Sequence, residues 1–108
     1  TEHPDLLSCG QVDEYFDKAV KWDPKQPNTQ ALYGVFLQMQ GKDDEALEHY
    51  ALALAYKPSL ADAHYNMGLI YYKQENWEAA VKHAQAAYAA GHRAPSLRRK
   101  LRDKGLLQ

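Results

Sequence analysis

Two stretches of the chain repeat one pattern: NTQALYGVFLQMQGKDDEALEHYALALAYKPSL at residues 28–60 and DAHYNMGLIYYKQENWEAAVKHAQAAYAAGHRA at residues 62–94. The matched positions include Gly34 and Gly68, Ala46 and Ala80, and Ala53 and Ala87, so the offset between the copies is 34 residues. Self-similarity at such a period is typical of arrays in which each unit is one helical hairpin that packs on its neighbours. The sequence therefore predicts an all-α protein, an alpha-alpha solenoid of antiparallel helix pairs.

Glycine and proline separate the expected helices. Apolar residues at helical spacing predict helices over residues 28–40, 43–57, 62–74 and 77–90. Gly41 and Gly91 each follow such a helix, at the position where a left-handed backbone is cheapest for glycine. Pro58 ends the second helix, because the residue before a proline is pushed out of the helical conformation. Short turns within each unit then force its two helices to run antiparallel.

The recurrence of Gly34 and Gly68 indicates a close contact between helices. Glycine inside a helix costs about 1 kcal/mol relative to alanine, so its repetition favours a role in packing. We expect both glycines to lie where paired helices cross, with Tyr50 and Tyr71 filling the space beside them.

The same period divides the chain into four parts of one domain. Residues 27–60 and 61–94 are the two units, residues 1–26 are an N-terminal half-repeat, and residues 95–108 hold a C-terminal capping helix. The half-repeat supplies only the second helix of a unit, at about residues 9–22, and is either degenerate or cut from a longer array. In the cap we expect Leu97 and Leu101 to face inward, beneath a polar outer face.

Composition and charge exclude several classes of protein and of site. The chain is 45% hydrophobic and 25% charged, and no apolar run approaches the roughly 18 residues that span a bilayer. Cys9 is the only cysteine, which excludes an intramolecular disulfide and a thiolate zinc site. Residues 1–50 hold ten acidic and four basic side chains, and residues 51–108 hold four acidic and nine basic ones. We therefore expect a dipole along the array, acidic first and basic last. The compartment stays open.

The second unit closely resembles a tetratricopeptide repeat. Met67 and Gly68 stand for the leucine–glycine pair of that family, and Tyr71, Ala80 and Ala87 are in register. The matching residues of the first unit are Gly34, Leu37, Ala46, Tyr50, Ala53 and Pro58.

The second unit departs from the family pattern at three positions. His64 stands in place of tryptophan, Ala84 in place of a bulky aromatic residue and His92 in place of proline. Ala84 leaves space, which we expect Leu97 or Leu101 of the cap to fill.

The resemblance implies a right-handed superhelix with a concave groove lined by the first helix of each unit. Members of the family generally hold peptide segments or helices of other proteins in this groove. Carried over to this chain, the peptide-binding residues are Asn28, Ala31, Val35, Gln38, Met39, Asp62, Tyr65, Asn66, Leu69, Tyr72, Lys73 and Arg99. Several of them are apolar or aromatic, so a partly hydrophobic ligand is expected. The alternative is that Tyr65, Asn66, Tyr72 and Lys73 merely follow the family pattern, whatever the ligand.

One subfamily binds the C-termini of chaperones through a clamp of lysines, asparagines and an arginine. Asn66 matches one clamp position and Lys100 offers a cation near another. Ala31 and Val35, however, stand where the clamp needs lysine and asparagine. A terminal carboxylate would lose much of its charge-assisted binding without those donors, so we reject this type of ligand.

The sequence supports no catalytic, cofactor or metal site. No two of the five histidines lie four residues apart on a helix, and Glu45 with His49 is the only pair of a carboxylate and a histidine at that spacing. Zinc needs three or four converging ligands. Ser8 and Cys9 lie near His3, but nothing orients that base. We therefore expect no enzymatic activity, no metal and no cofactor.

The leading hypothesis is a non-catalytic protein–protein interaction module or scaffold, which binds a peptide or helix of a partner protein. The alternatives are a self-assembling module, joined head to tail or as a dimer through the incomplete N-terminal repeat, and a regulatory fragment of a larger protein. The basic segment from His92 to Lys104 suits a solvated cap or an acidic protein partner. A pI near 6.5 argues against nucleic acid and membranes as partners.

Overall fold

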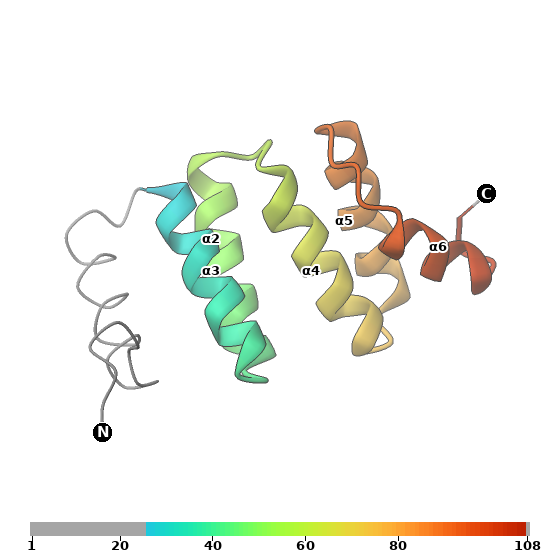
Figure 1. Ribbon diagram of the computed structural model, residues 1–108, viewed down its shortest axis with the longest axis horizontal. Coiled ribbons are helices and arrows are strands. Elements are labelled where there is room, and N and C mark those ends of the chain that lie inside the picture. Colours follow the sequence, from blue (N-terminus) through green and yellow to red (C-terminus); the bar gives the residue numbers. More distant parts are fainter. Residues whose placement is uncertain (1–25, 108) are drawn as a thin grey trace, which may run out of the picture.

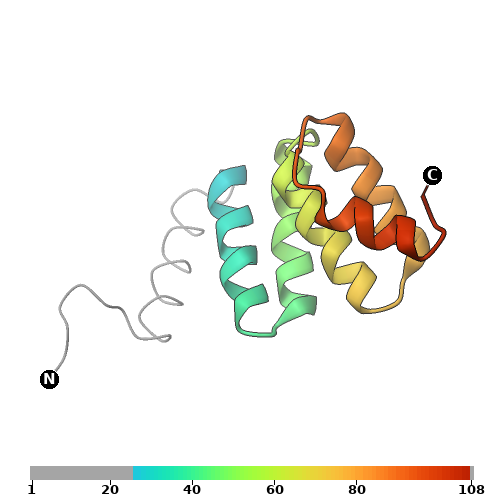
Figure 2. The same ribbon diagram turned by 45° about the vertical axis from the view of Figure 1, so that its right-hand side comes forward.

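The computed structural model describes residues 26–107, and within them every regular element is a helix. The helices are α2 (Pro27–Met39), α3 (Asp43–Tyr56), α4 (Ala61–Lys73), α5 (Trp77–Ala89) and α6 (Ser96–Asp103). α2 pairs with α3, α4 pairs with α5, and α6 crosses the second pair at an angle (Figures 1 and 2). The expected all-α helical repeat is therefore confirmed. The half-repeat and its helix at about residues 9–22 lie outside the described residues.

Four of these helices end in the same hydrogen-bonded turn. After α2, the Gly41 N–H donates to the Gln38 carbonyl at 3.0 Å and the Lys42 N–H donates to the Leu37 carbonyl at 2.9 Å. This pair of bonds is a Schellman motif, and it requires a left-handed residue, here Gly41 with φ of 79°. Matching bonds follow α4, α5 and α6.

The second unit differs from the first at this turn. Its left-handed residue is Glu75, with φ of 62°, because the 34-residue offset places no glycine there. A β-carbon in the left-handed conformation costs roughly 1–2 kcal/mol. The second unit thus repeats the helix–turn–helix arrangement of the first, but its turn after α4 carries backbone strain.

Gly34 lies where α2 crosses α3. A β-carbon built on Gly34 would come within 2.8–2.9 Å of three ring atoms of Tyr50. The Tyr50 ring is fully buried, and its hydroxyl donates to Gln38 Oε1 at 2.8 Å. The absence of a side chain at Gly34 therefore lets the tyrosine ring lie directly against the α2 backbone, as the recurrence of the glycine predicts.

In the second unit, α6 supplies the side chain that packs against the glycine at the helix crossing. The residue 34 positions after Tyr50 is Ala84, which is fully buried but too small to reach Gly68. Leu97 of α6 fills the place instead, with its Cδ2 only 2.6 Å from a β-carbon built on Gly68. Leu97 and Leu101 are both 0% exposed, which confirms that these leucines face inward.

The buried side chains form two clusters. The first cluster, around Tyr50, lies between α2, α3 and α4, and its members are Leu37, Ala46, Tyr50, Ala63, Met67 and Ile70. The second lies between α4, α5 and α6, and its members are Tyr65, Ala80, Ala84, Ala87, Leu97 and Leu101. α4 contributes side chains to both clusters. The face of α4 that points away from the clusters therefore borders an open surface.

Candidate functional site

Two clefts open along α4. Cleft 1, of about 160 Å³, lies between α2 and the start of α4 and is lined by Asn28, Ala31, Leu32, Val35, Leu60, Asp62 and Asn66. Cleft 2, of about 350 Å³, lies between the end of α4, the α2–α3 turn and α6 and is lined by Gln38, Asp43, Leu69, Ile70, Tyr72, Lys73 and Lys100.

One row of α4 residues joins the two clefts. Asp62 and Asn66 line cleft 1, and Leu69 and Lys73 line cleft 2. Residues spaced by three and four positions lie on one face of a helix. The clefts therefore belong to a single surface, which we call the trough.

Most residues of the expected groove lie in the trough. Those in cleft 1 are Asn28, Ala31, Val35, Asp62 and Asn66, and those in cleft 2 are Gln38, Leu69, Tyr72 and Lys73. Met39 is 81% exposed at the end of α2 but lines neither cleft. Arg99 is exposed on α6 and also lines neither.

The expectation that Tyr65 lies open in the groove is wrong. Tyr65 is only 8% exposed, because the chain that follows α5 folds back over its ring. The His92 ring stacks on it with centroids 3.9 Å apart and an interplanar angle of 11°. The Tyr88 ring meets it edge-on at 6.4 Å. Tyr65 is therefore a core residue of the second unit.

Sequence reasoning missed several trough residues, namely Leu32, Asp43, Leu60, Ile70 and Lys100. Leu32 had a signal, since it lies three residues before Val35 and hence on the same face of α2. For Lys100 the only signal was its place near one clamp position of the family, because its position in cleft 2 depends on how α6 packs against α4.

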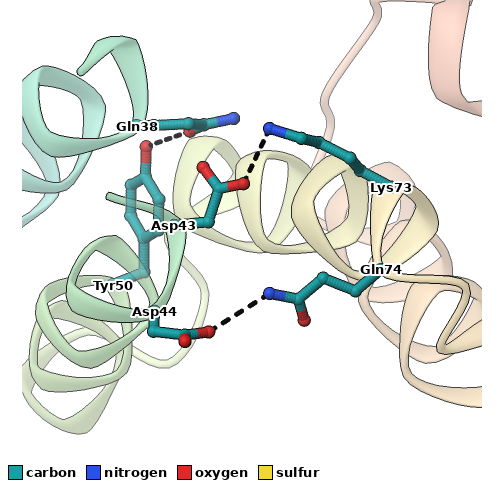
Figure 3. A network of polar contacts seen from close by, with 6 residues as sticks. All are labelled: Gln38, Asp43, Asp44, Tyr50, Lys73 and Gln74. Carbon is teal, nitrogen blue, oxygen red and sulfur yellow. Dashed lines mark hydrogen bonds and ion pairs between the residues drawn. The ribbon is translucent and has the colours of Figure 1, made fainter. Parts of the chain in front are cut away.

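A polar network ties the wall of cleft 2 together (Figure 3). The Lys73 ammonium donates to Asp43 Oδ2 at 2.8 Å, and the Gln74 amide donates to Asp44 Oδ1 at 3.2 Å. These contacts join the last turn of α4 to the first turn of α3, where helix dipoles favour a cation and an anion respectively. The Lys73 side chain is 69% exposed, so the ion pair contributes at most about 1 kcal/mol to stability and leaves Lys73 open to solvent.

Tyr50 positions Gln38 in the same network. Its hydroxyl donates to Gln38 Oε1, which leaves the amide nitrogen of Gln38 on the side of Lys73 (Figure 3). Burial raises the pKa of Tyr50 well above its ordinary value, and the nearby Asp43 carboxylate raises it further. The phenol therefore stays protonated and remains a hydrogen-bond donor at neutral pH.

Basic side chains at the C-terminal end of the array lie against aromatic rings, and one of them, Lys100, lines cleft 2. The Lys100 ammonium lies 5.6 Å from the centre of the Tyr72 ring, and the Lys104 ammonium lies 5.5 Å from the Trp77 ring. The Arg98 guanidinium lies 4.1 Å from the Tyr88 ring. Within residues 26–107, no arginine or lysine of α6 pairs with a carboxylate. The end of the array thus carries uncompensated positive charge held against aromatic faces.

The histidines between the helices form hydrogen bonds. His64 and His83 face each other between α4 and α5 with their Nδ1 atoms 3.1 Å apart, and His64 Nε2 lies 2.8 Å from the Pro58 carbonyl. A carbonyl can only accept, so neutral His64 carries its proton on Nε2 and His83 Nδ1 donates to His64. Burial lowers the pKa of His83, and His64 and then Lys82 lower it further. In the part of the chain that the structure describes, no three His, Cys, Asp or Glu side chains form a group that could hold a metal ion.

Comparison with known families agrees with this architecture. Residues 39–75, which span α3 and α4, match the family model described as TPR repeat. The resemblance to tetratricopeptide repeats is thereby confirmed, and such repeats generally mediate protein–protein interaction and are typically non-catalytic. No curated protein matches the chain. Of the helices between residues 26 and 107, none is both long and apolar enough to cross a membrane.

Proposed function

Because this chain carries tetratricopeptide repeats, we propose that it is a non-catalytic interaction module that holds a segment of a partner protein in the trough. The observation that carries this proposal is the continuous row of open side chains along α4, which joins clefts 1 and 2. Recognition sites usually combine apolar area with a few polar groups that fix orientation. The trough offers both kinds of side chain.

The apolar part of the trough is accessible. Leu32 is 56% exposed in cleft 1, and the partly buried Val35 and Leu69 line clefts 1 and 2 respectively. Open apolar side chains that lie together mark interaction surfaces. Polar groups flank them, since Asn66 lines cleft 1 and the amide of Gln38 lines cleft 2. These amides can pair with backbone groups of a bound segment.

Site-specific crosslinking tests the location of binding. A photoreactive amino acid is placed at Leu69 in the trough, or at Gln85, which is exposed on α5 and lines neither cleft. Each variant is irradiated in an extract of the source cells, and crosslinked proteins are identified by mass spectrometry. We expect the photoreactive residue at position 69 to crosslink a set of partner proteins and the one at position 85 to crosslink none of them.

Binding of an isolated partner then tests the same proposal with matched variants. Leu32→Asp and Leu69→Asp place a charge in the trough, whereas Gln85→Glu adds a charge outside it. We expect the two trough variants to weaken binding measured by isothermal titration calorimetry and Gln85→Glu to leave it unchanged. Equal affinity of all three variants, each with the circular dichroism of the parent, would remove the trough as the binding site.

A further inference from the structure

An apolar stripe runs along α2, the helix that also lines the clefts with Asn28 and Gln38. Leu32, Val35 and Met39 follow one another at intervals of three and four residues, so they form one stripe along the helix. Leu32 is 56% exposed and Met39 is 81% exposed. This spacing is the one with which a helix presents a seam to a second helix.

The α4 side is different, although it is built from equivalent positions. The residues 34 positions further along the chain are Asn66, Leu69 and Lys73. A polar residue, one leucine and a cation therefore stand at the positions of α4 that correspond to the apolar stripe of α2. A ligand that complements this asymmetry is itself apolar on one side and charged on the other.

The charge of the trough changes sign along its length. Asp62 lines cleft 1, and its side chain is 79% exposed. Cleft 2 contains Lys73 and Lys100 against one carboxylate, that of Asp43, which is only 13% exposed and already paired with Lys73. Lys100 lies against the Tyr72 ring and pairs with no carboxylate within residues 26–107. The accessible charge at the α6 end is therefore positive.

We propose that the trough binds an amphipathic helix of a partner protein whose apolar stripe meets α2 and whose carboxylates meet Lys73 and Lys100. This inference rests on the proposed function and adds the chemistry of the partner to it. Helix-in-groove recognition places apolar anchors at intervals of three, four and seven residues, which is the spacing that the α2 stripe offers. Complementary charge then sets the direction of the helix and its rate of association.

The acidic side chains nearby disfavour a nucleic acid in the same place. Asp62 opens onto cleft 1, and Asp43 lines cleft 2. A polyphosphate chain would be repelled by these groups, and its affinity comes mainly from neutralised phosphates. A helix with carboxylates at one end avoids this repulsion.

Designed peptides of about 15 residues, long enough to form a helix, serve as probes. The first carries leucine at heptad spacing and glutamate on the flank that would face α6, and the second carries lysine in place of each glutamate. The third probe is a DNA oligomer of mixed sequence. Binding to the full chain is followed by fluorescence anisotropy at low and at high salt.

We expect the acidic peptide to bind at least about tenfold more tightly than the lysine peptide, with the difference shrinking at high salt. Lys100→Glu should weaken the acidic peptide about tenfold, because an attraction becomes a repulsion. Arg102→Glu is the matched control, since it makes the same change of charge on α6 but lines neither cleft. It should have a much smaller effect.

Equal binding of the two peptides, equal effects of Lys100→Glu and Arg102→Glu, or tighter binding of the DNA oligomer would each overturn the inference. Leu32→Asp separates this failure from failure of the proposed function. If Leu32→Asp weakens both peptides alike while neither charge variant matters, the trough still binds protein and only the acidic chemistry is wrong. If Leu32→Asp also has no effect on a bound peptide, the trough is not the site, and both proposals fail.

Discussion

The two crossing glycines should respond differently to the same substitution. Gly34→Ala places a methyl group 2.8–2.9 Å from three atoms of the Tyr50 ring, which is fully buried and held by its hydrogen bond to Gln38. Gly68→Ala places one 2.6 Å from the end of the Leu97 side chain, and its next neighbours are at 3.5 Å. The rigid Tyr50 ring can relieve the contact only by moving as a whole, whereas Leu97 can change its side-chain rotamer.

The magnitudes follow from opposing terms. Each substitution gains about 1 kcal/mol of helix propensity. Overpacking a core costs typically 1–3 kcal/mol, and we assign Gly34→Ala to the upper part of this range because three ring atoms are involved. A displaced leucine rotamer costs about 0.5–1.5 kcal/mol. The free energy of unfolding should therefore fall by about 1–2 kcal/mol for Gly34→Ala and change by less than about 0.5 kcal/mol for Gly68→Ala.

Urea unfolding followed by far-ultraviolet circular dichroism measures both values, provided that the dependence on urea is the same in each variant. A second background isolates the cause. In a Tyr50→Leu protein, which imitates the leucine over Gly68, Gly34→Ala should no longer destabilise. Equal losses for the two glycine variants, or an undiminished loss for Gly34→Ala in the Tyr50→Leu background, would refute the reasoning.

Three further predictions concern backbone strain and titration. Glu75→Gly relieves the left-handed conformation after α4 and should raise the free energy of unfolding by about 1 kcal/mol in a urea titration. Asp43→Asn should lower the pKa of Tyr50 yet leave it above the ordinary value, because burial is the larger cause; absorbance of the phenol against pH measures this. The lowered pKa of His83 means that the unfolded chain binds a proton more readily, so stability is full above pH 6.5 and falls as the pH drops below it. His83→Gln, which retains a hydrogen-bonding side chain opposite His64, should flatten this part of the curve of unfolding free energy against pH.

Each of these predictions has a control. Glu75→Ala removes the same charge but keeps the β-carbon, so it should not stabilise. Asp44→Asn alters a neighbouring carboxylate that does not act on Tyr50 and should leave the phenol titration unchanged. An undiminished loss of stability below pH 6.5 in His83→Gln would show that another group titrates in this range.

Much of the trough could be predicted because its residues lie on single helices. The resemblance to tetratricopeptide repeats assigned Asp62, Asn66, Leu69 and Lys73 to the groove, their spacing puts them on one face of α4, and the structure places all four along clefts 1 and 2. Tyr65 shows the limit of this reasoning. Its position on α4 suits a groove residue, yet the ring of His92 covers it, and helical spacing cannot show where the chain beyond α5 goes.

The helices, their order and their pairing could be predicted from the sequence, because helical periodicity, turn residues and a 34-residue repeat are local properties of the chain. The same repeat predicted the small residues at the helix crossings. For the space beside Ala84 the sequence favoured Leu97 and Leu101 equally, and the packing of α6 places Leu97 against Gly68 as Tyr50 lies against Gly34. The same packing brings Lys100 to the end of the trough, and His92, in the chain between α5 and α6, covers Tyr65. These outcomes depend on which surfaces fit together across the fold, and the packing of distant side chains has no period along the sequence.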